Sequence, residues 1–165
     1  MAPTSSGTAS PPKPTLGAEH KRLAMFVGDW NVAGRQVESR VGPAAEIAGT
    51  ERFEWLAGGF FLIHHFDCRV GRDQAACIEV TGYDPATRSY PMHTYYNNGQ
   101  SAEWQMTEQD DTWVITGEWP MEGGAAQVRC TVEFGDAGNT RTGKWESSSD
   151  GAGWETFWEV RATRA

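Results

Sequence analysis

The chain has 165 residues, a length typical of one domain with a single core. Its 14 Lys and Arg residues are outnumbered by 22 Asp and Glu, and the formal net charge of -8 repels nucleic-acid phosphates and anionic lipids. No apolar run approaches the roughly 20 residues of a membrane-spanning helix, so neither nucleic acid nor a membrane is an expected partner.

The N-terminal stretch differs in composition from the rest of the chain. Residues 1–18 are rich in Pro, Ser, Thr and Gly and lack the apolar core of a secretory signal. We therefore expect a disordered tail over residues 1–18 and one folded domain over residues 19–165.

The three cysteines predict a reducing compartment. Cys68, Cys77 and Cys130 are odd in number and contain no Cys-x-x-Cys pair. Cys68 and Cys77 could face each other across neighbouring strands, but three buried free thiols are the simpler interpretation. The cytoplasm is the expected location.

One helix followed by a series of strands is expected in chain order. Residues Glu19 to Val27 place Leu23 and Phe26 at helical spacing, so a short helix should end at Gly28. From there onward the apolar period shortens to two between recurring turn signals. The expected strands are Asp29–Val37, Glu46–Leu56, Phe60–Arg69, Ala76–Tyr83, Ser89–Asn97, Ala102–Thr107, Thr112–Glu118, Ala126–Phe134, Thr140–Ser147 and Trp154–Thr163.

The connections between these strands favour an antiparallel meander. Asp-Pro, Asn-Gly and Gly-Asp sequences supply turn residues, and no connection is long enough for a parallel crossover. Closing the sheet removes its two open edges. We predict an all-β, about ten-stranded antiparallel up-and-down β-barrel with a short N-terminal helix. A two-sheet sandwich is the alternative, but it needs a few long returns. A barrel this wide should contain a cavity.

Residues 147–154, SSSDGAGW, resemble the Asp-box hairpin. In that hairpin the Asp side chain bonds turn amides and an aromatic ring packs beneath. The resemblance implies a structural role for Asp150 and Trp154.

Several segments resemble known barrels. LAMFVGDWNV, residues 23–32, resembles the start of a calycin barrel, the superfamily of lipocalins, fatty-acid-binding proteins and nitrobindins, where a short helix leads into Gly-x-Trp. In lipocalins this Trp packs against a late basic residue, which implies that Trp30 is buried at the closed end beside Arg161 or Arg164. With FEWLAGGFFLIHHFD, GYDPATRSY and GKWESSSDGAGW, the chain is similar to a bacterial calycin-like family of unknown function from Leu23 to Arg164. The resemblance implies a fold and no particular activity.

Two adjacent histidines stand in the apolar run GGFFLIHHFDC, residues 58–68. Alternate residues on a strand share a face, so His64 shares an apolar row with Leu62 and Phe66, whereas His65 shares the other row with Asp67. We therefore expect His64 inside the barrel and His65 outside. A bulge at the preceding glycines would reverse this assignment, and a core histidine with a polar neighbour is the structural alternative for His64.

Aromatic residues on the less charged strand faces are the other candidates for the interior. They are Trp104 with Met106, Trp145 with Gly143, Trp154 with Trp158, and the row Val128, Cys130, Val132 and Phe134. The fifth strand stays open between two faces, one with Tyr90, Met92, Thr94 and Tyr96 and the other with His93 and Tyr95. The candidate ligand-binding residues are Trp55, Leu62, His64, Phe66, Tyr96, Trp104, Trp145 and Trp158.

Glutamates inside the barrel would permit acid–base chemistry. We expect Glu54, Glu79 and Glu146 in solvent, because the inward positions should go to their apolar neighbours Trp55, Ile78, Val80 and Trp145. A buried glutamate would instead have a raised pKa and could pair with His64, as a barrel isomerase or cyclase would need. Serine-hydrolase and phosphate-loop motifs do not occur.

We expect no cofactor and no metal ion. Nitrobindins hold iron with a histidine close to the C-terminus, and no histidine follows His93 here. Haem would have to be bound by His64 or His93 from another strand, and a metal site would draw on His65, Asp67 and His93. A haem-binding, nitrobindin-like protein is therefore a minor alternative.

Together these features predict a small-molecule binding barrel with an aromatic-lined cavity for a small apolar or aromatic ligand. The alternative is a cavity enzyme, which requires His64 and a carboxylate within hydrogen-bond reach. The sequence decides neither whether a reaction is catalysed nor whether the chain forms a homodimer.

Overall fold

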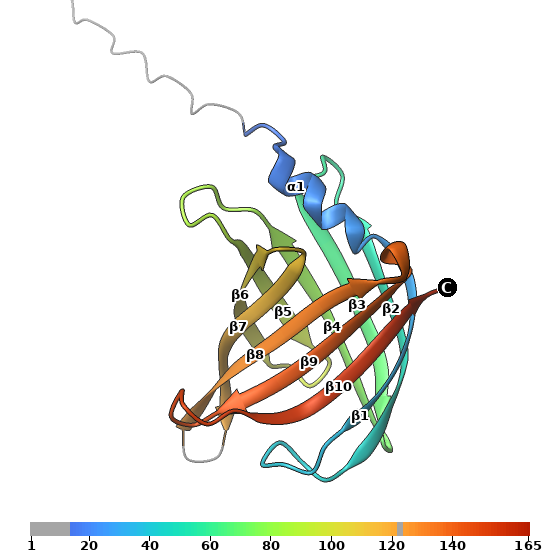
Figure 1. The fold of residues 1–165 in the computed structure, drawn as a ribbon, viewed down its shortest axis with the longest axis vertical. Helices are drawn as coiled ribbons and strands as arrows, with labels where there is room; N and C mark the ends of the chain where they lie inside the picture. Colours follow the sequence, from blue (N-terminus) through green and yellow to red (C-terminus); the bar gives the residue numbers. More distant parts are fainter. Residues whose placement is uncertain (1–13, 122–123) are drawn as a thin grey trace, which may run out of the picture.

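Ten antiparallel strands close into a barrel in the computed structural model, which describes residues 14–121 and 124–165 (Figure 1). Every strand pairs with its neighbours in sequence, and β1 closes the sheet against β10. The predicted ten-stranded antiparallel barrel with a short N-terminal helix is confirmed. The elements are α1 (Ala18–Arg22), η1 (Leu23–Met25), β1 (Gly28–Gln36), β2 (Ala45–Trp55), β3 (Phe61–Val70), β4 (Asp73–Gly82), β5 (Tyr90–Tyr96), β6 (Ser101–Gln109), β7 (Thr112–Met121), β8 (Gly124–Gly135), η2 (Asp136–Gly138), β9 (Thr140–Ser148) and β10 (Glu155–Arg164).

The helical segment is shorter than expected and tightens into a 3-10 turn. The sequence predicted a helix as far as Val27, whereas α1 ends at Arg22 and η1 continues to Met25. In a 3-10 turn, side chains three residues apart lie on the same side. Leu23 and Phe26 can therefore both be buried, with 0% and 5% of their surface exposed.

This helical segment lies across one end of the barrel and closes it (Figure 1). The ring of Phe26 packs against three barrel rings, Phe53, Trp113 and Phe134, at centroid distances of 5.6, 5.1 and 5.0 Å. Such aromatic pairs stabilise a core beyond the apolar area that they bury. The end beneath α1 is therefore the closed end of the barrel.

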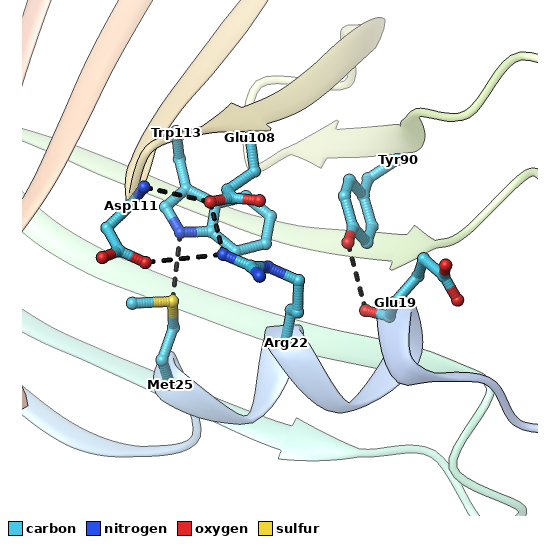
Figure 2. Close-up of polar contacts among 7 residues, drawn as sticks. All are labelled: Glu19, Arg22, Met25, Tyr90, Glu108, Asp111 and Trp113. Atoms are coloured by element: carbon cyan, nitrogen blue, oxygen red, sulfur yellow. Dashed lines mark hydrogen bonds and ion pairs between the residues drawn. The ribbon is translucent and has the colours of Figure 1, made fainter.

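Polar contacts fix the helical segment to the strands beneath it (Figure 2). Arg22 pairs with Glu108, and its Nη2 lies 3.5 Å from Asp111 Oδ1. The Tyr90 hydroxyl donates to the carbonyl of Glu19 at 3.1 Å. The helix is thus bound to β5 and to the β6–β7 hairpin.

Trp30 is fully buried at this closed end, as the Gly-x-Trp resemblance implied. Its indole Nε1 donates to the Phe26 carbonyl at 2.8 Å, and the Arg164 guanidinium lies 4.4 Å from its ring centroid. Arg164 also donates to the carbonyls of Val27 and Met25 at 2.7 and 3.0 Å. Of the two arginines considered, Arg164 makes this contact.

Gly28 makes room for the guanidinium. Its φ of +130° is one that side-chain-bearing residues rarely adopt, and a Cβ built there would lie 2.7 Å from Arg164 Nη1. Arg161 lies on the other face of β10, where it is exposed. Both residues of the motif therefore contribute to the contact with Arg164: the glycine leaves room for the guanidinium, and the tryptophan ring packs against it.

Three remaining expectations concern thiols, membranes and the tail. Cys68, Cys77 and Cys130 are free, and the first and last are buried. Within the described ranges, no helix has the length and apolar character to cross a membrane. Of the tail expected over residues 1–18, residues 1–13 lie outside the described residues.

Candidate functional site

A cavity of about 460 Å³ lies inside the barrel. Its walls are mostly apolar and include many rings. The aromatic residues that line it are Phe26, Phe53, Phe66, Tyr96, Trp104, Trp119, Trp145, Phe157 and Trp158.

The cavity reaches the barrel end opposite the helix. Its outermost lining residues include Val41 before β2, Gln74 at the start of β4, Asn97 and Asn98 after β5, and Met121 at the end of β7. These positions lie in the hairpin loops or at the strand ends beside them, at the end away from α1 (Figure 1). A ligand would therefore enter from that end, which the sequence left undetermined.

Polar side chains from five strands form a band across the inner wall. We call Glu51, His64, Glu79, Thr94 and Arg141 the polar belt; the first four come from β2 to β5. His64 pairs in register with Glu79, and Glu79 pairs with Thr94. Cross-strand partners point to the same face of a sheet, so the pairing places these three side chains on one face. That face is the inner one, because His64 and Glu79 line the cavity and Thr94 is buried.

His64 is held in a defined orientation by a carboxylate and a ring. Its Nδ1 bonds to Glu79 Oε1, and the Thr94 hydroxyl donates to the other Glu79 oxygen at 2.9 Å. The imidazole stacks on Phe53 with ring centroids 3.9 Å apart and planes 3° from parallel. Since a carboxylate accepts, Nδ1 carries the proton, and Nε2 is left as the free nitrogen of the ring.

Glu79 is ionised despite its burial. Burial raises the pKa of a carboxyl group, but the nearby His64 charge and the hydrogen bonds from His64 and Thr94 outweigh this effect and lower the pKa of Glu79 below its usual range. The His64–Glu79 pair is therefore an oriented, charge-assisted hydrogen bond.

Arg141 projects from β9 into the same region and is only 7% exposed. It forms an ion pair with Glu51 Oε2, an oxygen that also lies 3.7 Å from His64 Nε2. Its guanidinium lies over Trp30 and Phe53, 5.3 and 5.1 Å from the ring centroids. Burial lowers the pKa of Arg141 to about 9, so the group is still a cation at neutral pH.

Several buried polar atoms of the cavity wall are not hydrogen-bonded. Among the described residues, these atoms include Arg141 Nε, His64 Nε2 and Ser147 Oγ. Buried donors and acceptors are nearly always paired in folded proteins, because an unpaired one is destabilising. Two of these atoms lie on side chains that contact the same Glu51 oxygen. Polar atoms that could still form hydrogen bonds are therefore grouped at the inner end of the cavity.

Seven of the eight candidate ligand-binding residues line the cavity: Leu62, His64, Phe66, Tyr96, Trp104, Trp145 and Trp158. The eighth, Trp55, does not line it. Trp55 packs against the core at the last position of β2, near the closed end. Whether the seven contact a ligand stays a prediction.

The two histidines of the apolar run point in opposite directions. The side chain of His64 is 13% exposed and that of His65 is 43% exposed. His65 Nε2 lies 3.3 Å from Glu54 Oε1 on the outer face. His93, the other residue considered for haem, lies outside as well, with 51% of its side chain exposed. On β5, whose facing the sequence left open, the face with Thr94 and Tyr96 is the inner one.

The expectation that Glu79 faces solvent was wrong. Glu79 lines the cavity, whereas Ile78 lies on the outer face with 47% of its surface exposed. The expectation assumed that the more apolar row of β4 faces inward. Instead Glu79 finds hydrogen-bond partners inside, in His64 and Thr94, which compensate its burial. Glu54 does face outward, as expected. The expectation for Glu146 was wrong: it does not line the cavity, but it is only 7% exposed because its carboxylate pairs with Arg129 and Lys144.

Trp154 does not share the inner row with Trp158. A register shift lies between Thr156 and Trp158 in the pairing of β10 with β9, so strict alternation fails there. Phe157 and Trp158 consequently both line the cavity. Trp154 lies instead beneath the guanidinium of Arg129, at 4.2 Å from its ring centroid.

The Asp-box resemblance corresponds to a hydrogen-bonded turn. Asp150 Oδ1 accepts from the amides of Ala152 and Gly153 at 2.9 and 3.0 Å. These bonds lower the pKa of Asp150 to about 2. Together with the bond from Ser148 to Asp150, they give the segment the structural role that the resemblance implied.

Glu51 and Arg141 were missed by the sequence analysis. Glu51 lies two residues before Phe53 on the inner row of β2, so its facing follows from alternation with a buried ring. Arg141 gave a weaker signal, because it lies between Thr140 and Thr142 with no apolar contrast between the two rows.

The fold and the cavity define a closed ten-stranded antiparallel barrel with an aromatic-lined interior and a charged inner end. The chain belongs to the family described as "Protein of unknown function (DUF1579)", which matches residues 15–164. No curated protein matches the chain.

Two solved structures are similar in fold. One is titled "Crystal Structure of Rv2717c from M. tuberculosis", with a TM-score of 0.61 and 10% identity over 92% of this chain and 99% of that chain. The other is an S-type phycobiliprotein lyase, CPES, from Guillardia theta, with a TM-score of 0.61 and 14% identity over 89% of this chain and 92% of that chain. At these identities the likeness concerns the fold alone.

Proposed function

We propose that the protein is a small-molecule binding barrel whose cavity takes a small apolar or aromatic ligand. The observation that carries this proposal is the aromatic-lined cavity of about 460 Å³, open at one end of a closed barrel. Ligand pockets commonly measure about 300–1,000 Å³ and combine apolar walls with a few polar groups. A fold shared with a protein titled as a lyase adds support for a barrel that engages another molecule.

The polar belt would decide the affinity. A ligand that hides about 300 Å² of apolar surface gains roughly 7.5 kcal/mol, and association costs at least about 4 kcal/mol. The difference corresponds to binding near the millimolar range. Tighter binding therefore needs a polar anchor. The candidates are the His64 and Arg141 atoms that have no hydrogen-bond partner in the described ranges.

Native mass spectrometry of the protein purified from its own host tests the proposal first. A retained small molecule is expected, and its displacement by the neutral dye Nile red would locate it in the cavity. Val128 lines the cavity and Gln127 is exposed on the same strand, so Val128→Trp should abolish dye binding and Gln127→Trp should not. A protein that carries no molecule and binds no dye contradicts the proposal.

The His64–Glu79 pair favours a cavity enzyme as the second candidate function. A carboxylate that bonds one nitrogen of an imidazole orients the other as a general acid or base, and His64 Nε2 has this arrangement. We propose acid–base chemistry of the isomerase or cyclase type as the reaction class. Comparison of wild type with His64→Gln in a host metabolite extract tests it, and the expected sign is a mass-neutral conversion that only the wild type performs. No conversion by wild type contradicts the enzyme.

The remaining parts of the proposal concern the superfamily, the location, the oligomeric state and haem. Membership of the calycin superfamily fits the buried Trp30 and its Arg164 contact, and a cytoplasmic location fits the three free thiols. A homodimer could use the exposed Ile78 and Tyr95, which are paired across β4 and β5; sedimentation would detect it. Against the haem alternative, His93 lies on the outer face, and His64 Nδ1 is bonded to Glu79 while its unbonded Nε2 lies 3.7 Å from the Glu51 carboxylate.

A further inference from the structure

The acidic and basic side chains that line the cavity are paired with one another before any ligand arrives. In the described part of the chain they are two carboxylates, Glu51 and Glu79, one guanidinium, Arg141, and one imidazole, His64. Glu51 pairs with Arg141, and Glu79 pairs with His64. A further carboxylate brought in by a ligand would be a third negative charge against these partners, in surroundings where an uncompensated ion is strongly unfavourable.

The polar belt nevertheless includes a donor that could accept a further hydrogen-bond partner. Arg141 is 93% buried, as its 7% exposure implies, and its Nε has no hydrogen-bond partner among the described residues. A guanidinium only donates, so the missing partner is an acceptor. The two nearest ring systems, Trp30 and Phe53, offer only their faces to the guanidinium.

The cavity walls around this donor favour a particular kind of ligand body. The lining of the cavity away from the belt is largely aromatic, with Phe66, Trp104, Trp119 and Trp145 among its rings. Trp104 and Trp119 are nearly parallel, with centroids 5.9 Å apart and planes 20° from parallel. Flat aromatic molecules pack well against such surfaces.

We infer that the cavity takes a neutral aromatic molecule that carries a carbonyl or ether oxygen, and that this oxygen accepts a hydrogen bond from Arg141 Nε at the inner end. This inference rests on the proposed binding function and names the chemical class of its ligand. A neutral acceptor satisfies the buried donor without disturbing either the Glu51–Arg141 pair or the Glu79–His64 pair, whereas a carboxylate would compete with Glu51 for Arg141.

Three probes of matched shape test the inference. They are 2-acetylnaphthalene, which has a ketone oxygen, 2-ethylnaphthalene, which lacks it, and 2-naphthoate, which has a carboxylate in the same place. We expect the ketone to bind at least about tenfold more tightly than the hydrocarbon, as one hydrogen bond to a charged donor would give, and the carboxylate to bind most weakly. Isothermal titration calorimetry measures all three affinities.

Variants assign the preference to Arg141. In the double variant Glu51→Leu/Arg141→Met, which removes both partners of the ion pair together, the ketone and the hydrocarbon should bind equally. The control is Arg161→Met, which removes an exposed arginine of the outer face and should keep the ranking of the wild type.

Each outcome separates the inference from the proposed function. A ketone preference that the double variant loses supports the inference. Equal binding of ketone and hydrocarbon, or tightest binding of 2-naphthoate, overturns it and leaves the binding function standing. If none of the probes binds and the purified protein carries no molecule, both are overturned.

Discussion

The ion pair between Glu51 and Arg141 should contribute little to folding, although breaking it on one side should be strongly destabilising. Both residues are almost fully buried, at 6% and 7% exposure, so both charges have lost most of their water. Glu51→Leu alone leaves a cation in an apolar interior, and Arg141→Met alone leaves an anion there. Each single substitution should lower the free energy of unfolding by about 3–5 kcal/mol.

The double variant should recover nearly all of this loss. Leu and Met roughly match the volumes that they replace, and apolar replacement of a buried ion pair is often neutral or stabilising. Arg141 Nε also has no hydrogen-bond partner among the described residues, so its removal relieves one unfavourable term. We therefore expect the double variant to be within about 1 kcal/mol of the wild type, or more stable.

Urea unfolding followed by tryptophan fluorescence measures these differences, provided that the slope m stays constant across the four proteins. The four free energies form a double-mutant cycle with an expected coupling of several kcal/mol. If the double variant loses as much as the two single variants combined, the charges are stabilised independently of each other and the reasoning is refuted. If the double variant is stable, the pair is retained for a reason other than folding.

Other predictions concern the closed end, the thiols and acid stability. Trp30→Ala should lower the free energy of unfolding by about 3–5 kcal/mol, because it truncates a large core side chain. The control Tyr95→Ala, which removes a 60% exposed ring, should change it little. A loss under about 1 kcal/mol for Trp30→Ala in urea unfolding would contradict this packing. Burial raises the pKa of Cys68 to about 12, and a thiolate is the reactive form, so a thiol reagent at pH 7.5 should modify Cys68 only in unfolded protein; rapid modification of the native protein would contradict this. Folding lowers the pKa of Glu79. The ionised Glu79 therefore stabilises the fold fully above its usual pKa of 4.5, and this stabilisation is lost as the pH falls further. Glu79→Gln should make the free energy of unfolding fall less steeply below pH 4.5, and an unchanged acid profile would count against an ionised Glu79.

The closed end of the barrel was predictable from the sequence because its signals are local. The resemblance of a helix, a glycine and a tryptophan within a few residues to a known barrel entry implied the burial of Trp30, and Arg164 is placed over it when β10 closes the sheet against β1. The strand pattern was equally local, since period two and turn residues mark each hairpin. These features depend on backbone geometry more than on what the barrel encloses.

The interior chemistry was less predictable, because the usual rule reads the apolar row of a strand as the inner one. On β4 the inner row is Ala75, Cys77, Glu79 and Thr81, while Ile78 and Val80 face outward. The rule presumes a packed interior, and here a cavity with its own polar belt replaces part of the core. The outward Ile78 lies opposite His65 and Tyr95 on the neighbouring strands, where cross-strand contacts cover part of it.

Cross-strand register would have supplied the missing step. The turn between β3 and β4 consists of Gly71 and Arg72, and Gly71 has a φ of +62°, as a tight two-residue hairpin turn requires. A two-residue turn pairs Val70 with Asp73, and counting back along both strands brings His64 opposite Glu79. Partners in register point to the same face, so the inward facing of His64 entails the inward facing of Glu79. Turn chemistry therefore determines the facing of β4 where its hydrophobicity misleads, and the histidine and its carboxylate partner have to be assigned together.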